Sequence, residues 1–354
     1  MSQQVPYSKL FTPPRFLEMA SVSVEIKPRG ITFLSTKNTE RGLLPDVYGV
    51  IPLPENAVAF GEIIKKEPVI KALVEIKKRT KVDFVRYSIP EEKSYIFMVN
   101  LPLLKPKEMR DILDFKIEEN VSLSAKEAVF DYDIVPGSTY KSNLDVVVSV
   151  VPLDIVEEMQ SLCLQAGLTP ISFSSESSNV ARSVIKSSNE QVIIVVYIRE
   201  ANIILSLVVH GVVCQTSSVN FGSSTFTDLL AKYFKVSLAE AEEIKKEKLY
   251  TDNPDNMEVF SYLINTISAI KDELFKFISY CNEREDVTGQ VDRVILCGQD
   301  ALMMGFDKYL SLNLDIRVDV ANVWVNNFDL DKYVPDINHV ASQNLLTVNG
   351  LSLL

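Results

Sequence analysis

Runs of aliphatic and β-branched residues alternate with stretches of helical spacing, and the order of these patterns occurs twice along the chain. Each half begins with two apolar runs around a charged turn, adds a third strand-like run, and then alternates helices and strands. Runs rich in Val, Ile and Leu are typical of buried strands. The pattern predicts an α/β chain in which two mixed sheets are covered by helices and enclose a cleft. The segments are 21–37, 47–53, 59–79 and 82–89, then 191–222, 224–248, 257–285 and 291–298.

Two connections in this pattern carry specific expectations. Residues 38–46, which contain Gly42 and Pro45, are predicted to form a loop before the third strand of the first half. In the second half, residues 199–202 read Arg-Glu-Ala-Asn and are predicted to form a hairpin tip. Tight tips favour Gly, Asn and Asp, because these residues adopt positive φ at low cost. The adjacent charges of Arg199 and Glu200 therefore indicate either a solvated tip or a contact in the cleft.

A segment without a counterpart in the second half, residues 95–168, separates the strand over 82–89 from the strand and helix that complete the first half. Within 95–168 the pattern is strand, helix, two strands, helix, which predicts a compact βαββα module inserted in the first domain. The predicted domains are an N-terminal segment, a first domain in two pieces, the module and a second domain, with boundaries at 1–20, 21–94 and 169–188, 95–168, and 189–354.

The charge and the residue inventory exclude several function classes. The 354 residues include 47 acidic and 36 basic side chains, for a net charge of −11, which disfavours a nucleic-acid partner. The four cysteines have no C-x-x-C spacing, a pattern typical of a reducing compartment. Only two histidines are present, so we expect neither a zinc or other metal site nor a His-dependent triad. No run reaches about 18 apolar residues, so direct membrane insertion is not expected.

Six short segments, taken in order, resemble one protein family. The resemblance is to the actin-like ATPase superfamily in its FtsA-like branch, and within it to the PilM family of type IV pilus assembly proteins. It spans nearly the whole chain and implies an actin-like α/β fold with two ribonuclease H-like domains and an inserted SHS2-like module. The segments are "FTPPRFLEMASVSVEI", "AFGEII", "LCLQAGLTPISFSSES", "VSLAEAEEIKK", "VILCGQDALMMGFDKYL" and "TVNGLSLL".

The resemblance implies a role for the hairpin tips. Actin-like ATPases hold nucleotide phosphates between two Asp-x-Gly hairpins, in which the carboxylate orients Mg²⁺ and the glycine lets N–H groups approach phosphate. The matching positions are Glu25 and Lys27 in the first hairpin, and Tyr197 and Arg199 in the second. Both hairpins lack the glycine, and the second lacks the carboxylate. Lys27 and Arg199 remain candidate phosphate partners, and Glu25 and Glu200 candidate metal-side carboxylates.

The adenosine side matches the family better. Ala241, Glu242 and Lys245 keep its Ala-Glu-x-x-Lys pattern, in which the charged pair faces ribose and base in relatives. Gly222 and Gly298 each keep one glycine of a Gly-Gly pair, and the resemblance places Glu273 at the border of the same pocket. An exposed i, i+3 pair and ordinary turn glycines are the alternatives. The cofactor therefore stays open between ATP or ADP with Mg²⁺ and none.

Function follows from the same comparison of motifs. Because neither Asp-x-Gly hairpin is intact, we assign no catalytic residue and expect a degenerate ATPase rather than an enzyme. A pilus-assembly platform is favoured. The alternatives are an active actin-like ATPase or sugar-kinase-like enzyme, an FtsA-like cell-division scaffold, and a scaffold that binds no nucleotide. Fold alone does not decide between them.

The resemblance also implies a partner. PilM-like proteins are cytoplasmic and are held at the inner membrane by the N-terminal cytoplasmic tail of a single-pass, PilN-like pilus protein. The tail binds in a groove between the inserted module and its neighbouring domain. The candidate contacts are Phe97 and Leu101 on the first strand of the module, and Ile112 and Phe115 on its first helix. The alternative is that these side chains form the module's own core. Contact with the pilus ATPase and self-association stay open.

Overall fold

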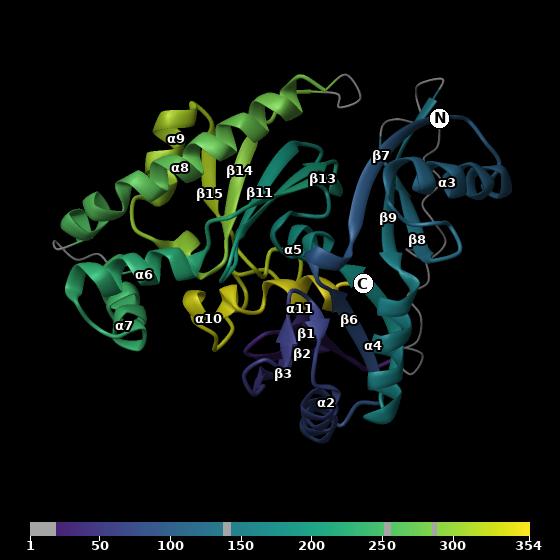
Figure 1. Cartoon of the computed structure of the whole chain (residues 1–354), viewed down its shortest axis with the longest axis horizontal. Coiled ribbons are helices and arrows are strands. Elements are labelled where there is room, and N and C mark those ends of the chain that lie inside the picture. Colours follow the sequence, from purple (N-terminus) through teal and green to yellow (C-terminus); the bar gives the residue numbers. More distant parts are fainter. Residues whose placement is uncertain (1–18, 137–142, 251–255, 285–288) are drawn as a thin grey trace.

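The structure, a computed structural model, describes residues 19–136, 143–250, 256–284 and 289–354. In these ranges it has two five-stranded sheets, a three-stranded sheet and a small two-stranded one. Figure 1 shows the two large sheets as separate layers with helices on their faces, and the three-stranded sheet beside them. We call the sheet β10-β6-β1-β2-β3, with helices α2 and α4, lobe I. The sheet β13-β12-β11-β14-β15, with helices α6 to α9, is lobe II.

Lobe I is built on a central strand whose two faces are both buried. Val22, Val24 and Ile26 of β1 point into the lobe core, while Ser23 and Glu25 lie buried on the opposite face. Strand β2 pairs antiparallel with β1 and β3, whereas β6 and β10 continue the sheet in parallel. The elements are β1 Ser21–Lys27, β2 Gly30–Thr39, β3 Gly42–Pro52, α2 Lys66–Thr80, β6 Phe84–Ile89, α4 Leu153–Gln165 and β10 Thr169–Ser175.

The predicted loop over 38–46 is wrong. Strands β2 and β3 stay paired out to Thr39 and Gly42, so the turn consists of two residues only. The hydroxyl of Thr39 donates to the carbonyl of Gly42, and Lys37 Nζ lies 2.6 Å from Asp46 Oδ1 across the ladder. These cross-strand contacts, together with backbone pairing, outweigh the low strand propensity of the Gly and Pro in this segment.

Lobe II repeats the arrangement of lobe I, as the sequence pattern predicted. Its first three strands form a meander, and β14 and β15 extend the sheet in parallel. Every residue of β11 and β12 is buried, which explains their uninterrupted apolar runs. The elements are β11 Val192–Ile198, β12 Ile203–Val209, β13 Val212–Val219, α6 Ser223–Phe234, α7 Leu238–Leu249, α8 Asn256–Asn282, β14 Arg293–Cys297, α9 Phe306–Leu314 and β15 Arg317–Val320.

The segment between β6 and α4 forms a small layer of its own. Its strands β7 Tyr95–Pro102, β8 Ala128–Ile134 and β9 Asn143–Pro152 have the order β7-β9-β8, and helix α3 Pro106–Asn120 covers one face. The other face contributes Ile96, Met98, Val135 and Val147 to the core of lobe II. Helix α4, predicted as the last element of the module, buries Met159, Leu162 and Cys163 in the core of lobe I.

Two helices cross between the lobes. Helix α5 Glu176–Val184 follows β10, and helix α11 Leu346–Ser352 lies near the end of the chain (Figure 1). They approach so closely that a Cβ on Gly350 would lie 1.7 Å from the carbonyl oxygen of Asn179. Leu34 of lobe I and the lobe II sheet share one buried cluster with both helices. The lobes are therefore joined by packed apolar side chains on this side of the cleft.

Five short elements connect the larger ones in the described part of the chain. They are β4 Val58–Ala59, β5 Glu62–Ile63, the 3₁₀ helices η2 Glu91–Lys93 and η4 Gln299–Leu302, and α10 His339–Gln343. Among the described residues, none of the helices combines the length and apolar character needed to cross a bilayer.

Candidate functional site between the lobes

The tips of the first hairpin of each lobe are in contact. Residues 28–29 form the tip of β1–β2, and residues 199–202 form that of β11–β12, as the sequence predicted for the latter. Arg29 Nη2 lies 2.6 Å from Glu200 Oε1, and both side chains are largely exposed. An exposed ion pair contributes little stability by itself. Its position nevertheless shows that the two tips are in direct contact.

Arg199 reaches from lobe II to two carboxylates outside that lobe. Its Nη1 donates to Glu92 Oε1 at 2.7 Å, its Nη2 donates to Glu92 Oε2 at 3.3 Å, and its Nε lies 3.3 Å from Glu176 Oε1. Glu92 belongs to η2, and Glu176 is the first residue of α5. Two donors on one carboxylate form the bidentate geometry in which Arg–carboxylate pairs are strongest. The side chain of Arg199 is 20% exposed, so the solvated-tip interpretation is wrong for this residue.

The two carboxylates respond to this environment in opposite directions. Burial raises the pKa of Glu176 to about 7, although Arg199 partly offsets the effect and nearby Glu25 adds to it. For Glu92, burial alone would raise the pKa, but the hydrogen bond and charge of Arg199 outweigh it and lower the pKa below its usual value. Arg199 therefore keeps Glu92 ionised, while Glu176 titrates near neutral pH.

Glu25 and Lys27 pair with each other. Because they are two residues apart on β1, their side chains lie on the same face of the sheet. Lys27 Nζ lies 2.8 Å from Glu25 Oε2, and Glu25 is 4% exposed. A buried carboxylate that is already compensated by an ammonium has less to offer a Mg²⁺ ion. Within the described residues, no group of three or more His, Cys, Asp or Glu side chains is arranged to hold a metal ion.

Gly222 is required by the chain's own backbone. A Cβ at this position would lie 2.5 Å from the carbonyl oxygen of Glu200 and 2.6 Å from the backbone nitrogen of Asn202. The next two residues, at the N-terminus of α6, donate their backbone N–H groups to the tip: Ser223 to the carbonyl of Arg199 and Ser224 to that of Glu200, both at 2.9 Å. Donors that could bind an anion at a helix N-terminus are thus engaged internally.

Gly298 has a similar structural explanation. Its φ is +96°, and a Cβ there would lie 2.2 Å from the carbonyl oxygen of Ile198, at the end of β11. Its N–H group donates to Gln343 Oε1 at 3.1 Å. Only glycine combines this backbone conformation with such a close approach. The turn glycine therefore positions β14 and η4 against the second hairpin.

Lys245 is buried among polar partners. Its side chain is 1% exposed, so the interpretation as an exposed i, i+3 pair is wrong for it. The ammonium joins α7 to α6 and η4: its Nζ lies 2.7 Å from Ser223 Oγ, 3.0 Å from Thr227 Oγ1, 3.0 Å from Glu242 Oε2 and 3.2 Å from Asp300 Oδ1. Since the ammonium has three donors, these partners already satisfy it.

Asp300 was not among the predicted site residues. It lies in η4, is fully buried, and also accepts a hydrogen bond from the hydroxyl of Tyr250. The available signal was an aspartate in an otherwise apolar segment, two residues after the turn glycine Gly298. A charge at a buried position requires a partner, but the sequence did not indicate that Lys245 would be that partner.

Glu273 lies on the long helix α8 and forms an ion pair with Lys276 of the same helix at 2.7 Å. Its side chain is 42% exposed. This is the i, i+3 arrangement that is common on helix surfaces.

The four candidate partner contacts divide into two groups. Leu101 is 4% exposed and belongs to the core between α3 and the three-stranded sheet, against which Phe97 and Ile112 are also packed. Phe115 is 72% exposed on α3. Leu101, Phe97 and Ile112 therefore belong to the module's own core, which was the alternative interpretation. Phe115 is the member of the set that is exposed and can contact a partner.

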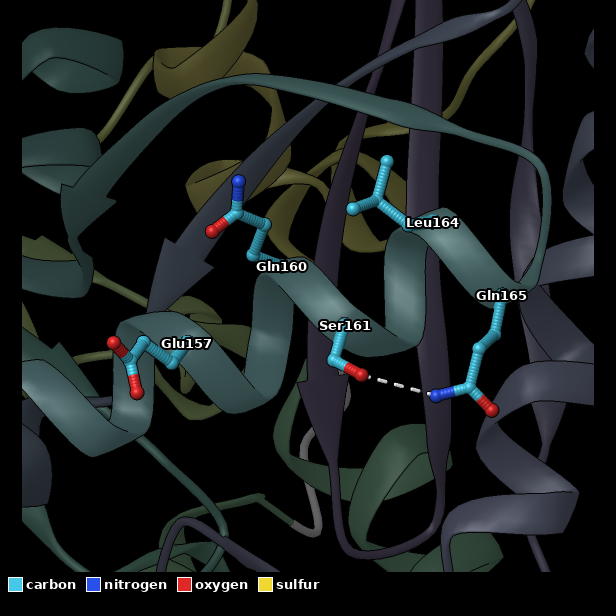
Figure 2. A pocket seen from close by; sticks show the side chains of 5 residues that line it. All are labelled: Glu157, Gln160, Ser161, Leu164 and Gln165. Carbon is cyan, nitrogen blue, oxygen red and sulfur yellow. Dashed lines mark hydrogen bonds between the residues drawn. The ribbon is translucent and has the colours of Figure 1, made fainter.

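Two hollows on the described surface are relevant to the site, one on α4 and one beside Arg199. Figure 2 shows the side chains that line the first of them, all from α4: Glu157, Gln160, Ser161, Leu164 and Gln165, where Gln165 Nε2 donates to Ser161 Oγ at 3.1 Å. The second is smaller, about 200 Å³, and lies beside the contact between Arg199 and Glu92. Its lining is mostly hydroxylic and acidic: Glu91, Glu92, Ser94, Asn202, Ile204, Thr216, Ser217 and Ser218.

Several solved structures share this fold. A structure described as the PilM-PilN type IV pilus biogenesis complex is 15% identical, with a TM-score of 0.75, over 94% of this chain and 98% of that chain. The ethanolamine utilization protein EutJ from Carboxydothermus hydrogenoformans is 15% identical, with a TM-score of 0.55, over 97% and 90%. MreB5 of Spiroplasma citri bound to ADP is 12% identical, with a TM-score of 0.55, over 94% and 95%.

These similarities confirm the expected actin-like α/β fold. The sequence profile of the family described as Type IV pilus assembly protein PilM matches residues 23–353. The chain belongs to that family.

Proposed function

We propose that the chain is a docking platform for type IV pilus assembly. In this proposal it lies on the cytoplasmic face of the inner membrane and binds the cytoplasmic N-terminal tail of a single-pass, PilN-like membrane protein. Nucleotide binding is weak or absent, and ATP is not hydrolysed efficiently. The family match over 23–353 supports the pilus role, and the similar structure described as a PilM-PilN complex supports the class of partner.

The observation that carries the choice of docking surface is the exposure of Phe115. Helix α3 buries Met109, Leu113 and Ile117 against the module sheet, yet it leaves this large aromatic side chain on its outer surface. Exposed aromatic side chains are enriched among residues that dominate protein interfaces. We therefore place the tail against α3 rather than between the module and lobe II, because Ile96 and Met98 already fill that contact.

The internal contacts of the cleft support the nucleotide part of the proposal. Lys27, Arg199 and Lys245 all have carboxylate partners within the chain. Each glycine retained from the family's motifs is required by a close approach of the chain's own backbone. A nucleotide would have to displace several of these contacts at once, at a cost in free energy for each.

A binding measurement with a matched control tests the docking surface. The probe is a fluorescent peptide with the sequence of the cytoplasmic N-terminal tail of a PilN-like membrane protein from the same organism. We expect Phe115→Glu to weaken binding about tenfold or more, equivalent to about 1.4 kcal/mol. The control is Leu312→Glu on α9 of lobe II, where the native side chain is 83% exposed. Equal affinities of wild type and the Phe115 variant would contradict the proposed surface.

A point substitution is a sharper test than removal of 95–168. Deleting that segment would take away Met159 and Leu162 from the core of lobe I. It would also uncover the lobe II surface that Ile96 and Met98 cover. Loss of binding after such a deletion would therefore report unfolding as well as docking.

A further inference from the structure

We infer that the ion pairs between the two hairpin tips and lobe I form a latch that closes the cleft without a nucleotide. The latch consists of Arg199 with Glu92 and Glu176, supported by Arg29 with Glu200. It lies at the two hairpin tips, to which the resemblance assigns the phosphates of a nucleotide. The inference goes beyond the proposed docking function and does not depend on any partner.

Each lobe contributes one arginine to the latch, and each arginine is held by carboxylates outside its own lobe. Arg199 is presented by lobe II and is held by two carboxylates outside it: Glu92 of η2, which follows β6 of lobe I, and Glu176 at the start of α5, which joins the lobes. Arg29 is presented by lobe I and is held by Glu200 of lobe II. Opening the cleft at the tips would therefore separate opposite charges on both sides. Contacts within one lobe would be unaffected by such a movement.

The main strength of the latch lies in Arg199. Its guanidinium is 20% exposed, and Glu176 is 4% exposed. Separation would break the bidentate contact with Glu92 and leave the partly buried guanidinium without either carboxylate, which is costly. By contrast, Arg29 and Glu200 are 84% and 51% exposed, so water can replace that pair at little cost. The two arginines of the latch thus provide a strong member and a weak one for comparison.

The backbone of the tip reinforces the same closed arrangement. The carbonyls of Arg199 and Glu200 accept hydrogen bonds from the first residues of α6, and Gly222 permits this contact without a Cβ. The tip is therefore held rigidly within lobe II. A rigid tip transmits the position of the Arg199 guanidinium to the whole lobe, so the side-chain contacts define how far the lobes close.

The shared core limits what the latch can control. Helices α5 and α11 join the lobes through buried apolar side chains, so loss of the latch would not separate them. The expected movement is a rotation about these helices that widens the mouth of the cleft. A nucleotide performs this closure in proteins where it bridges two lobes. Here the chain's own charges perform it.

The experiment measures the distance between the lobes in the full chain. Spin labels are attached through Lys78→Cys on α2 and Leu312→Cys on α9, both exposed positions in different lobes. The four native cysteines are buried, so labelling is confined to the introduced thiols. Distances are recorded by pulsed electron paramagnetic resonance with and without millimolar MgATP, in the wild-type background and in Arg199→Gln, Glu92→Gln and Arg29→Gln.

We expect one narrow distance in the wild-type background that MgATP does not change. Arg199→Gln shifts this distance to longer values and broadens it, while Arg29→Gln has a smaller effect. Glu92→Gln removes the bidentate contact but keeps Glu176 beside Arg199, so it shifts the distance in the same direction by a smaller amount, even where Arg199→Gln folds poorly. The inference is overturned if Glu92→Gln or a folded Arg199→Gln has the wild-type distance. A change of the wild-type distance on addition of MgATP would overturn it as well.

Discussion

Lys245 and Asp300, 55 residues apart in the sequence, form a buried ion pair in lobe II with 3.2 Å between Nζ and Oδ1. Their side chains are 1% and 0% exposed. Hydroxyl groups of Ser223, Thr227 and Tyr250 complete the hydrogen bonds of this pair. The pair therefore links α6, α7 and η4, three elements that the resemblance assigned to the adenosine side of the cleft.

Removal of the ammonium is predicted to be strongly destabilising. Lys245→Met keeps most of the side-chain volume but leaves Asp300 buried without its cation, so we expect a loss of about 3–5 kcal/mol in the free energy of unfolding. The matched control is Lys246→Met, one residue further on the same helix, where the native lysine forms an exposed pair with Glu243. That change should cost less than about 1 kcal/mol. Urea unfolding measures both, and equal losses would contradict the structural role.

The buried strands could be predicted from the sequence, whereas the burial of Lys245 could not. The first two strands of lobe II followed from uninterrupted Val, Ile and Leu runs, because burial on both faces leaves a direct mark on composition. The spacing of Glu242 and Lys245 did not predict burial, since an i, i+3 pair has the same sequence pattern on a helix surface and in a core. The burial of Lys245 depends on Thr227 and Asp300, which the fold brings from other elements.

Arg199 shows the same limit for the cleft. The tip itself was predictable, because two apolar runs bracket residues 199–202. Its partners were not, since Glu92 lies 107 residues away in the sequence and Glu176 belongs to a different helix–strand unit. The two-residue turn between β2 and β3 was missed for a related reason: its pairing depends on cross-strand contacts rather than on the propensity of Gly42 or Pro45.

The crossing of α5 and α11 is predicted to exclude any side chain at Gly350. In an open helix, replacing Gly by Ala stabilises by up to about 1 kcal/mol. Here the new Cβ would lie 1.7 Å from the carbonyl oxygen of Asn179, so Gly350→Ala should instead destabilise by about 1–3 kcal/mol or more. Thermal unfolding measures the sign directly. Gln160→Ala on the exposed face of α4 is the control, and it should change the midpoint little. A stabilised Gly350→Ala protein would contradict the crossing.

A third prediction concerns pH and rests on Glu176. Its pKa is raised from 4.5 to about 7, mainly by burial, so the folded chain keeps a proton that the unfolded chain has released between these values. Wild type therefore loses stability, relative to Glu176→Gln, as the pH rises from about 4.5 to about 7, and the difference then stays constant. The charged groups around this carboxyl are Arg199, Glu25, Lys27 and Glu91.

Glu92→Gln provides the control of opposite sign. Arg199 lowers the pKa of Glu92, so its ionised form stabilises the fold at neutral pH, and this contribution disappears as the pH falls through the lowered value. Unfolding midpoints of the three proteins between pH 4 and pH 8 measure both effects. If the stability differences of the two variants from wild type change with pH in the same direction, the assignment of the two carboxylates is wrong.

The last prediction concerns nucleotide itself. Because Glu25, Lys27 and Arg199 are engaged by partners within the chain, we expect no phosphate release from ATP above background and no change in the unfolding midpoint up to millimolar MgATP or MgADP. The midpoint is a sensitive measure, since a ligand at 100 times its dissociation constant stabilises the fold by about 2.7 kcal/mol. ATP hydrolysis that Glu25→Ala abolishes would refute the prediction. A rise in the unfolding midpoint on addition of nucleotide would also refute the prediction. Arg29→Gln is the control: because Arg29 is exposed, we do not expect a bound nucleotide to need it, so genuine binding would raise the midpoint equally in wild type and in this variant.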